Sequence, residues 1–228
     1  MIKIKNLDKF LYGGGRRVNI LNGINLIIPQ GQFLAVTGPS GSGKTTLLSL
    51  IAGLDSVSNG SIEIDGQEIA GWKEDQLALL RSKSFGFVFQ NFHLIPTLTA
   101  IENIILAREL GGGTDAPEKA AALLEQVGLK DRLKHYPAQM SGGEQQRLSI
   151  ARAFVNEPKI VLADEPTGNL DSKNTENIMH LISDLQKTKG ATIVMVTHEP
   201  ELANQAQRII VMEDGLIVKD LPSIVNPV

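Results

Sequence analysis

The sequence predicts an α/β protein with a mainly parallel β-sheet, an antiparallel β region near the N-terminus and an inserted block of helices. Short apolar runs alternate with helix-like stretches in the later part of the chain, which is typical of a parallel sheet. Near the N-terminus apolar and polar residues alternate, and the middle of the chain has helical composition. We expect one domain over residues 1–228, with the helical subdomain at about 91–157.

The N-terminal region predicts an antiparallel β subdomain. Ile2, Ile4 and Leu7 alternate with polar residues, and residues 24–28 repeat the pattern before a Pro-Gln-Gly turn. A further strand pair is expected at 60–69, around an Asp-Gly turn. Because the first residues alternate apolar with basic side chains, we expect a strand at the N-terminus and not a signal peptide.

The rest of the chain predicts the parallel core and the helical insertion. The apolar run at 33–37 is typical of a strand that is buried on both faces, and a glycine-rich loop and a helix follow it. Further strands are expected at residues 160–163, 192–197, 208–212 and 216–218. Helices are expected at residues 44–52, 75–83, 100–110, 116–127, 144–156 and 172–189.

Composition excludes several classes of protein. Hydrophobic residues make up 42% of the chain and charged residues 21%, as in globular proteins and unlike disordered ones. The net charge of −3 gives no basic signal, so we expect no nucleic-acid partner. Without cysteine there is no disulfide and no thiolate metal site. No apolar run approaches the ~18 residues of a membrane-spanning helix, so we expect a cytoplasmic protein unless another subunit holds it at a membrane.

A glycine-rich loop carries the first functional signal. Residues 38–45 match G-x-x-x-x-G-K-[ST] between an apolar strand and a helix, which predicts a P-loop NTPase core. Lys44 is expected to neutralise the β- and γ-phosphates of ATP, and Thr45 to offer its hydroxyl to Mg²⁺. The alternative is a flexible glycine-rich turn. The expected nucleotide-binding residues are Gly38, Pro39, Ser40, Gly41, Ser42, Gly43, Lys44, Thr45 and Thr46.

Two carboxylates follow a second apolar strand. In a parallel sheet the strand at 160–163 would end beside the phosphate loop, where ligands bind. Asp164 is then expected to hold Mg²⁺, and Glu165 to polarise the attacking water. The alternative is a pair of solvated acids that cap the turn before Pro166.

The segment Met-Ser-Gly-Gly-Glu-Gln-Gln-Arg at 140–147 closely resembles the signature motif of the ABC-transporter ATPases, usually written LSGGQ followed by QR. In that family the motif binds the γ-phosphate held by the other subunit of a dimer, which implies such a role for Ser141, Gly142 and Gly143. Met140 and Glu144 depart from the usual Leu and Gln. A serine N-cap with glycines before a helix describes the segment equally well locally.

Other segments resemble the family in the expected order. The resemblance makes Gln90 the Q-loop glutamine, a Mg²⁺ or water contact, and Asp171 the D-loop aspartate that joins two sites across the dimer. It makes His198 the switch histidine, which contacts the γ-phosphate. Tyr12 is our candidate for the aromatic residue that stacks on adenine, although relatives often carry it one residue earlier; Phe10 is a weaker candidate, and Tyr12 as an ordinary loop residue stays open.

Residues 91–103 resemble the branch that contains the MacB exporters, the LolD lipoprotein-release ATPases and the cell-division ATPase FtsE. An apolar cluster there would receive a helix of a membrane subunit, or simply pack the helical subdomain. The resemblance implies an ATP-hydrolysing subunit that powers export or extraction. It also implies a homodimer that sandwiches two ATP molecules, bound to a membrane permease on the inner face of the cell membrane. An FtsE-like regulatory ATPase that moves no cargo is the alternative, and a soluble ABC ATPase of DNA repair or translation is a more distant one.

Overall fold

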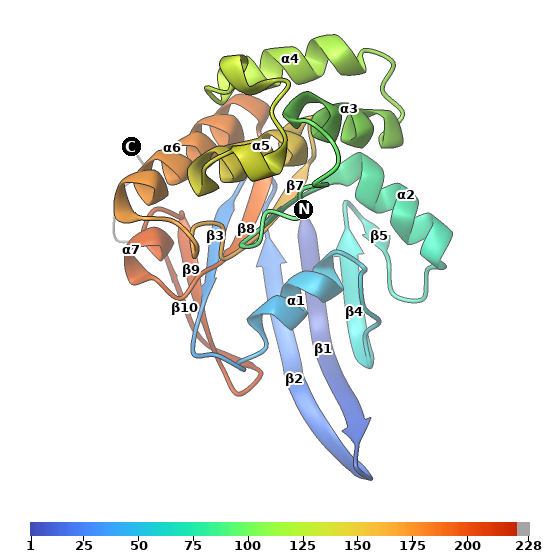
Figure 1. Ribbon diagram of the computed structural model, residues 1–228. Helices are drawn as coiled ribbons and strands as arrows, with labels where there is room; N and C mark the ends of the chain where they lie inside the picture. The colour runs from blue at the N-terminus through green and yellow to red at the C-terminus, as the bar shows by residue number, and fades with distance from the viewer. Residues whose placement is uncertain (223–228) are drawn as a thin grey trace. The chain divides into compact units, whose positions relative to one another are not determined.

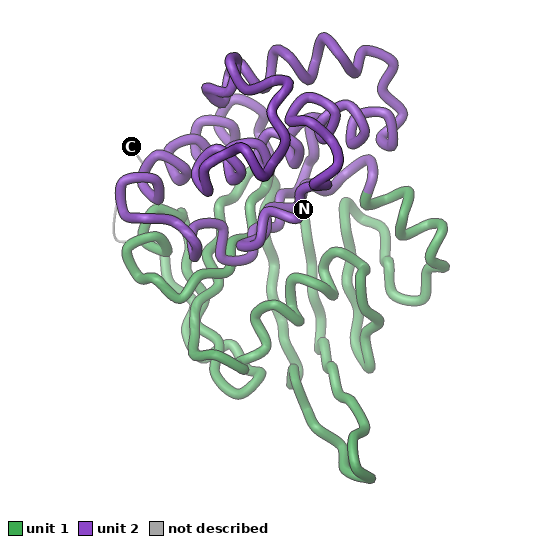
Figure 2. The backbone as a smooth tube through the Cα atoms, in the orientation of Figure 1, with its two compact units in different colours: residues 1–81, 192–228 green, residues 82–191 purple. Residues whose placement is uncertain are grey.

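The computed structural model describes residues 1–222 (Figure 1). The chain divides into two compact units, and each is described by itself (Figure 2). The first unit comprises Met1–Arg81 and Thr192–Val228, and the second comprises Ser82–Ala191.

The first unit begins with an antiparallel sheet of strand order β2-β1-β4-β5. Strands β1 and β2 form a long hairpin (Figure 1), whose register sets Ile2 opposite Ile28. Ile2 also faces Ile64 on β4, so the alternating isoleucines of three strands meet on one buried face. The strands are β1 (Ile2–Gly13), β2 (Arg16–Ile28), β4 (Asn59–Ile64) and β5 (Gln67–Glu68).

The second sheet of this unit carries the parallel core. Its strand order is β10-β9-β3-β8, and β3 runs parallel to both β8 and β9. The register aligns Val36 of β3 with Val196 of β8, and both strands are buried almost throughout. The strands are β3 (Phe33–Thr37), β8 (Thr192–Val196), β9 (Arg208–Glu213) and β10 (Leu216–Pro222), and the short helices are α1 (Lys44–Ile51) and α7 (Pro200–Ala203). Helix α2 (Glu74–Ser84) runs to the boundary of the unit.

The second unit contains two parallel strands and most of the helices. Strands β6 (Phe85–Phe89) and β7 (Ile160–Asp164) pair in a register that aligns Phe89 with Asp164. The α-helices are α3 (Ala100–Leu110), α4 (Ala116–Gln126), α5 (Gly142–Phe154) and α6 (Ser172–Lys189). Two 3-10 turns, η1 (Lys130–Arg132) and η2 (Pro137–Gln139), precede α5.

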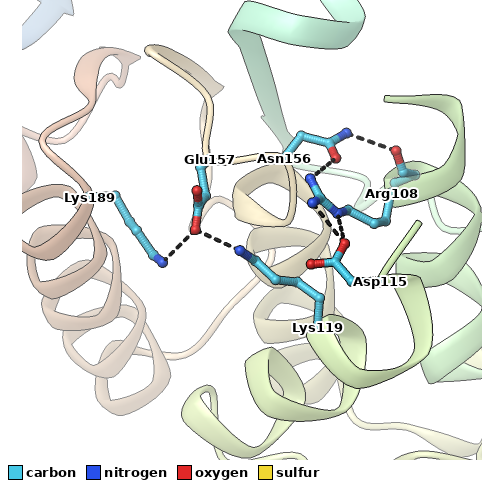
Figure 3. Close-up of polar contacts among 7 residues, drawn as sticks. Arg108, Asp115, Lys119, Asn156, Glu157 and Lys189 are labelled. Atoms are coloured by element: carbon cyan, nitrogen blue, oxygen red, sulfur yellow. Dashed lines mark hydrogen bonds and ion pairs between the residues drawn. The ribbon is translucent and has the colours of Figure 1, made fainter. Parts of the chain in front are cut away.

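A charged cluster joins several of these helices at the turn between α5 and β7. Glu157 accepts hydrogen bonds from Lys119 of α4 at 2.7 Å and from Lys189 of α6 at 3.2 Å, so Figure 3 shows two lysines converging on one carboxylate. Lys119, followed by Lys189, lowers the pKa of Glu157. Beside it Arg108 pairs with Asp115 and reaches Asn156 (Figure 3). Each pair is partly exposed and therefore contributes little alone, so the cluster acts mainly by fixing geometry.

The predicted fold class is confirmed, and helices 100–110 and 172–189 have the predicted bounds. Helix α5 lies two residues earlier than the predicted 144–156, and strand β10 extends to Pro222, beyond the predicted 218. Strand β6, helix α7 and the two 3-10 turns were not predicted. Helices α3, α4 and α5 fall within the predicted insertion, whose limits of 91–157 stay a prediction. Over residues 1–222, no helix has both the length and the apolar character required to span a membrane.

Candidate functional site

The phosphate loop connects β3 to α1 in the first unit. Its backbone is held in a conformation that requires glycine: Gly38 has φ +138°, and a Cβ there would lie 2.0 Å from the carbonyl oxygen of Met212. Gly41 and Gly43 also have positive φ. A side chain at Gly38 or Gly43 would therefore clash with its neighbours, whereas at Gly41 only the positive φ favours glycine.

The polar groups of this loop fit a phosphate. Helix α1 starts at Gly43, which has no side chain to cap the helix, and its first turn contains no acidic residue. This helix N-terminus therefore offers a favourable dipole to an anion and has no acidic side chain in its own first turn. Lys44 is buried and donates to the carbonyls of Gly38 and Pro39 at 2.8 Å each, and the buried Ser42 hydroxyl has no hydrogen-bond partner within residues 1–222. The remaining predicted loop residues are Ser40 and Gly41, which are exposed, and Thr45 and Thr46, which lie in the first turn of α1.

His198 lies at the end of the strand next to this loop. The Thr197 N–H donates to the carbonyl of Val36 at 3.2 Å, so β3 and β8 end at the same level. Thr197 is buried and His198 is exposed directly after it. The first unit thus brings the phosphate loop and His198 to the carboxyl ends of two adjacent parallel strands.

Tyr12 lies near the tip of the β1–β2 hairpin. Tyr12 is 76% exposed, and its ring lies nearly perpendicular to that of Phe10, with the ring centroids 5.7 Å apart. Arg17 covers Phe10 at 3.8 Å, in a cation–π contact. Because Phe10 already has two partners, Tyr12 is the more accessible of the two rings.

In the second unit, β6 and β7 end in the polar residues that the sequence singled out. Asp164 closes the buried strand β7 beside Phe89, so Gln90 and Glu165 follow adjacent strand ends. Glu165 has φ +46°, a left-handed backbone that is uncommon for a residue with a side chain. The structure therefore brings Gln90, Asp164 and Glu165 to one end of this strand pair.

The loop after Glu165 contacts the segment after β6. Asn169 donates to the backbone carbonyl of Gln90 at 2.9 Å, and the Gln90 side chain donates to Asn169 at 3.3 Å. Asp171 caps helix α6 by accepting from the Asn174 N–H at 2.9 Å, and this bond together with the Asn174 side chain lowers its pKa. The exposed Asp171 is thus an N-cap residue of α6.

The signature turn starts α5. Ser141 is its N-cap and forms a capping box with Glu144, whose carboxylate accepts from the Ser141 N–H at 2.8 Å and from the Ser141 hydroxyl at 2.9 Å. Arg132 of η1 donates to the other carboxylate oxygen at 2.8 Å. The backbone hydrogen bond from Ser141, followed by the contact with Arg132, lowers the pKa of Glu144 to about 2. Gly142 and Gly143 form the first turn, and Gly143 is buried.

Sequence reasoning did not single out the polar residues on the buried face of α5. Gln146 is fully buried and donates to the carbonyl of Pro166, next to Glu165. Ser149 and Arg152 donate to the carbonyl of Phe92, and Arg152 also reaches that of His93. The spacing of these residues could have indicated their burial. Positions 146 and 149 lie about one helical turn apart, on the same face of α5 as its buried apolar residues.

A comparison with protein families identifies the chain. A sequence model described as "ABC transporter" matches residues 21–168, well over half of the chain. The chain belongs to the ABC transporter family. Among known ABC transporter proteins, the lipoprotein-releasing system ATP-binding protein LolD of Idiomarina loihiensis is 45% identical over 96% of this chain and 97% of its own length. The macrolide export ATP-binding/permease protein MacB of Bdellovibrio bacteriovorus is 44% identical over 96% of this chain, but only 34% of MacB is covered.

Solved ABC transporter structures have the same fold. A dimeric structure of the bacterial ABC transporter cassette MJ0796 matches 99% of this chain and 100% of that chain, with a TM-score of 0.91 and 40% identity. A dimeric post-hydrolysis state of the same cassette, bound to ADP and Pi, matches with a TM-score of 0.90 and 39% identity.

These findings confirm the predicted family, its MacB/LolD branch and the enzyme class. The chain is an ATP-binding, ATP-hydrolysing subunit of an ABC transporter that powers export or extraction. The relatives favour this function over the cell-division alternative.

Proposed function

We propose that Glu165 is the general base that activates water for attack on the γ-phosphate of ATP. The carrying observation is the β6–β7 register, which sets Gln90 and Glu165 directly after paired strand ends. A left-handed backbone at Glu165 supports the assignment, because strained backbone is concentrated at functional sites. Lys44 neutralises the β- and γ-phosphates with the loop residues 38–46, and His198 contacts the γ-phosphate.

Mg²⁺ belongs to this proposal. The donor set suits it, because Asp164 offers a carboxylate, Gln90 an amide oxygen and Thr45 a hydroxyl, and Mg²⁺ prefers oxygen ligands. When bound, the ion neutralises charge on the transferring phosphoryl group.

The partners follow from the relatives. Two copies of this chain sandwich two ATP molecules, each between the phosphate loop of one copy and Ser141, Gly142 and Gly143 of the other. Asp171 connects the two sites, and Tyr12 stacks on adenine. The dimeric cassettes of known structure support this arrangement, and the permease of MacB supports a membrane permease as partner. The chain then acts in the cytoplasm, on the inner face of the membrane, and its cargo resembles the lipoproteins or macrolides named for its relatives.

Glu165→Gln tests the general-base role. We expect ATP to bind with wild-type affinity while turnover falls at least ~100-fold, since a positioned general base contributes about that much. Light scattering should show the variant as a dimer in Mg-ATP, because hydrolysis no longer separates the two copies.

Glu157→Gln is the matched control. Glu157 precedes β7 with φ +50°, much as Glu165 follows it with φ +46°, but its carboxylate contacts Lys119 and Lys189. We expect Glu157→Gln to hydrolyse ATP at the wild-type rate. Turnover by Glu165→Gln that equals that of Glu157→Gln would remove Glu165 from the mechanism.

A further inference from the structure

We propose that Asn169 is a positioning residue that determines which end of the Gln90 amide is presented to the metal ion; this inference rests on the proposed role of Gln90. Asn169 lies in the exposed loop between β7 and α6, and Gln90 directly follows β6. The sequence motif of the D-loop includes Asn169 but gives it no function.

The orientation of Asn169 is fixed by a backbone carbonyl, an acceptor that cannot become a donor. Its Nδ2 donates to the backbone carbonyl of Gln90 at 2.9 Å and to the Asn91 side-chain oxygen at 3.3 Å. A backbone carbonyl only accepts, so the NH₂ end of Asn169 must face the backbone and the Oδ1 end must face the Gln90 side chain.

The Gln90 amide is then oriented in turn. Its Nε2 donates to Asn169 Oδ1 at 3.3 Å. Because the nitrogen and oxygen of an amide lie on opposite sides of the group, the Oε1 end of Gln90 is directed away from Asn169. An amide oxygen is a ligand for a hard cation, whereas an amide NH₂ repels it. Asn169 therefore selects the orientation of Gln90 that binds metal.

Close packing strengthens this selection. A Cβ at Gly168 would lie 2.7 Å from Gln90 Nε2, so the loop backbone reaches the Gln90 amide directly. The following residues are fixed independently, since Arg152 and Ser149 of α5 hold the carbonyl of Phe92. Loss of the Asn169 side chain should therefore release Gln90 without unfolding the rest of the segment.

Asn169→Asp and Asn169→Ala test the proposal in the full-length chain. Asp has nearly the shape of Asn and still accepts from Gln90 Nε2, but it loses the donation to the Gln90 carbonyl, whereas Ala loses both contacts. In the Glu165→Gln background, Mn²⁺ is titrated against bound fluorescent mant-ATP. We expect Asn169→Ala to raise the half-saturating Mn²⁺ concentration about tenfold, the effect of roughly one lost hydrogen bond, and Asn169→Asp to raise it less, because Asp still accepts from Gln90 Nε2. Affinity for mant-ATP without metal should not change.

The control variants separate this inference from the function on which it rests. Asn91→Ala removes only the 3.3 Å hydrogen bond that Asn169 donates to the Asn91 side chain. Its half-saturating Mn²⁺ concentration should equal that of the parent Glu165→Gln chain. Gln90→Ala should raise the half-saturating Mn²⁺ concentration as far as Asn169→Ala does. The double variant should raise it no further. A Gln90→Ala chain that titrates like the parent would overturn the metal role of Gln90 and this proposal with it. A tenfold rise of the half-saturating Mn²⁺ concentration in Gln90→Ala, with no rise in Asn169→Ala, would overturn the positioning role alone.

Hydrogen exchange provides a readout that needs neither nucleotide nor metal. The N–H of Phe92 bonds to the carbonyl of Phe89, and the N–H of Leu170 bonds to that of Thr167. These turns carry Gln90 and Asn169, so both N–H groups should exchange about tenfold faster in Asn169→Ala. Unchanged protection at both would show that Asn169 does not hold the two loops together.

Discussion

Two helices of this chain, α1 and α5, begin at glycine-rich turns, but their N-termini are capped differently. Helix α1 starts at Gly43 without a side-chain cap, and its first turn contains no acidic residue. Helix α5 starts at Ser141, and the carboxylate of Glu144 already lies at its N-terminus. The cations beside the two turns also differ, because Lys44 donates to the backbone carbonyls of Gly38 and Pro39, whereas Arg132 pairs with the carboxylate of Glu144.

The difference shows that two glycine-rich turns can form a helix N-terminus in two ways, one without an internal anion and one with it. The first turn has neither a side-chain cap nor an acidic residue, so its helix N-terminus can receive an external anion. In the second turn Glu144 already accepts from the Ser141 hydroxyl, so a phosphate that binds there, as we propose, would compete with Glu144 for this hydroxyl. We therefore expect the first turn to dominate ATP affinity in a single chain, and the second to matter once two chains meet.

The largest effect should come from Gly38→Ala compared with Gly142→Ala. At Gly38 the new Cβ would meet the Met212 carbonyl at 2.0 Å, whereas at Gly142 the nearest atom is Leu170 Cδ2 at 3.7 Å. We expect Gly38→Ala to lower the free energy of unfolding by about 3 kcal/mol and Tm by about 10 °C. Gly142→Ala should change it by no more than about 0.5 kcal/mol. Thermal unfolding measures both, and equal losses would mean that the two turns are equally constrained.

Lys44→Ala compared with Arg132→Gln should give the next largest effect. We expect Lys44→Ala to weaken ATP binding about 100-fold, or about 2.7 kcal/mol, because a charge-assisted contact to phosphate is lost. Arg132→Gln should leave the affinity within about twofold, since its charge serves Glu144. Calorimetry with a non-hydrolysable ATP analogue checks both. Equal losses of affinity would contradict the difference between the turns.

Glu144→Gln should give the smallest effect, and one that depends on pH. The pKa of Glu144 is about 2 in the folded chain, whereas its ordinary value, which applies in the unfolded chain, is 4.5. Between these pH values the unfolded chain therefore binds more protons than the folded one. The stabilisation from Glu144 is thus present above about pH 4.5 and is lost as the pH falls through 2. Between pH 6 and pH 3 the wild type should lose about 1–2 kcal/mol more than Glu144→Gln in urea unfolding. Equal losses would mean that the internal anion does not stabilise α5.

Much of the fold could be predicted because its signals are local. The five apolar residues of β3 and the glycine loop after them indicate a buried strand and a turn without reference to distant residues. Helix α6 begins at Asp171 and ends before Gly190, two residues typical of helix ends, and its predicted bounds are confirmed. The end of β10 was missed because its last residues are exposed and lack an alternating pattern.

The site could be predicted only in part. Motifs with fixed spacing, such as the loop before Lys44, indicate their residues directly. The contacts of Asn169, Arg152 and Gln146 join segments that are far apart in sequence, so no local pattern predicts them. Neutral amides and backbone carbonyls also give no charge signal, which is why the junction at Gln90 emerged only from the structure.

The paired strand ends described above set limits on where this chain tolerates a change in length. Strands β3, β6, β7 and β8 each have five residues, and each is followed by a residue or loop that we propose to act on ATP. One residue added inside a strand would displace the following motif by about 3.3 Å relative to its neighbour. A reporter domain inserted at the exposed Gly112 would leave every strand end in place. That loop is therefore the natural site for a fluorescent or affinity label in a working transporter.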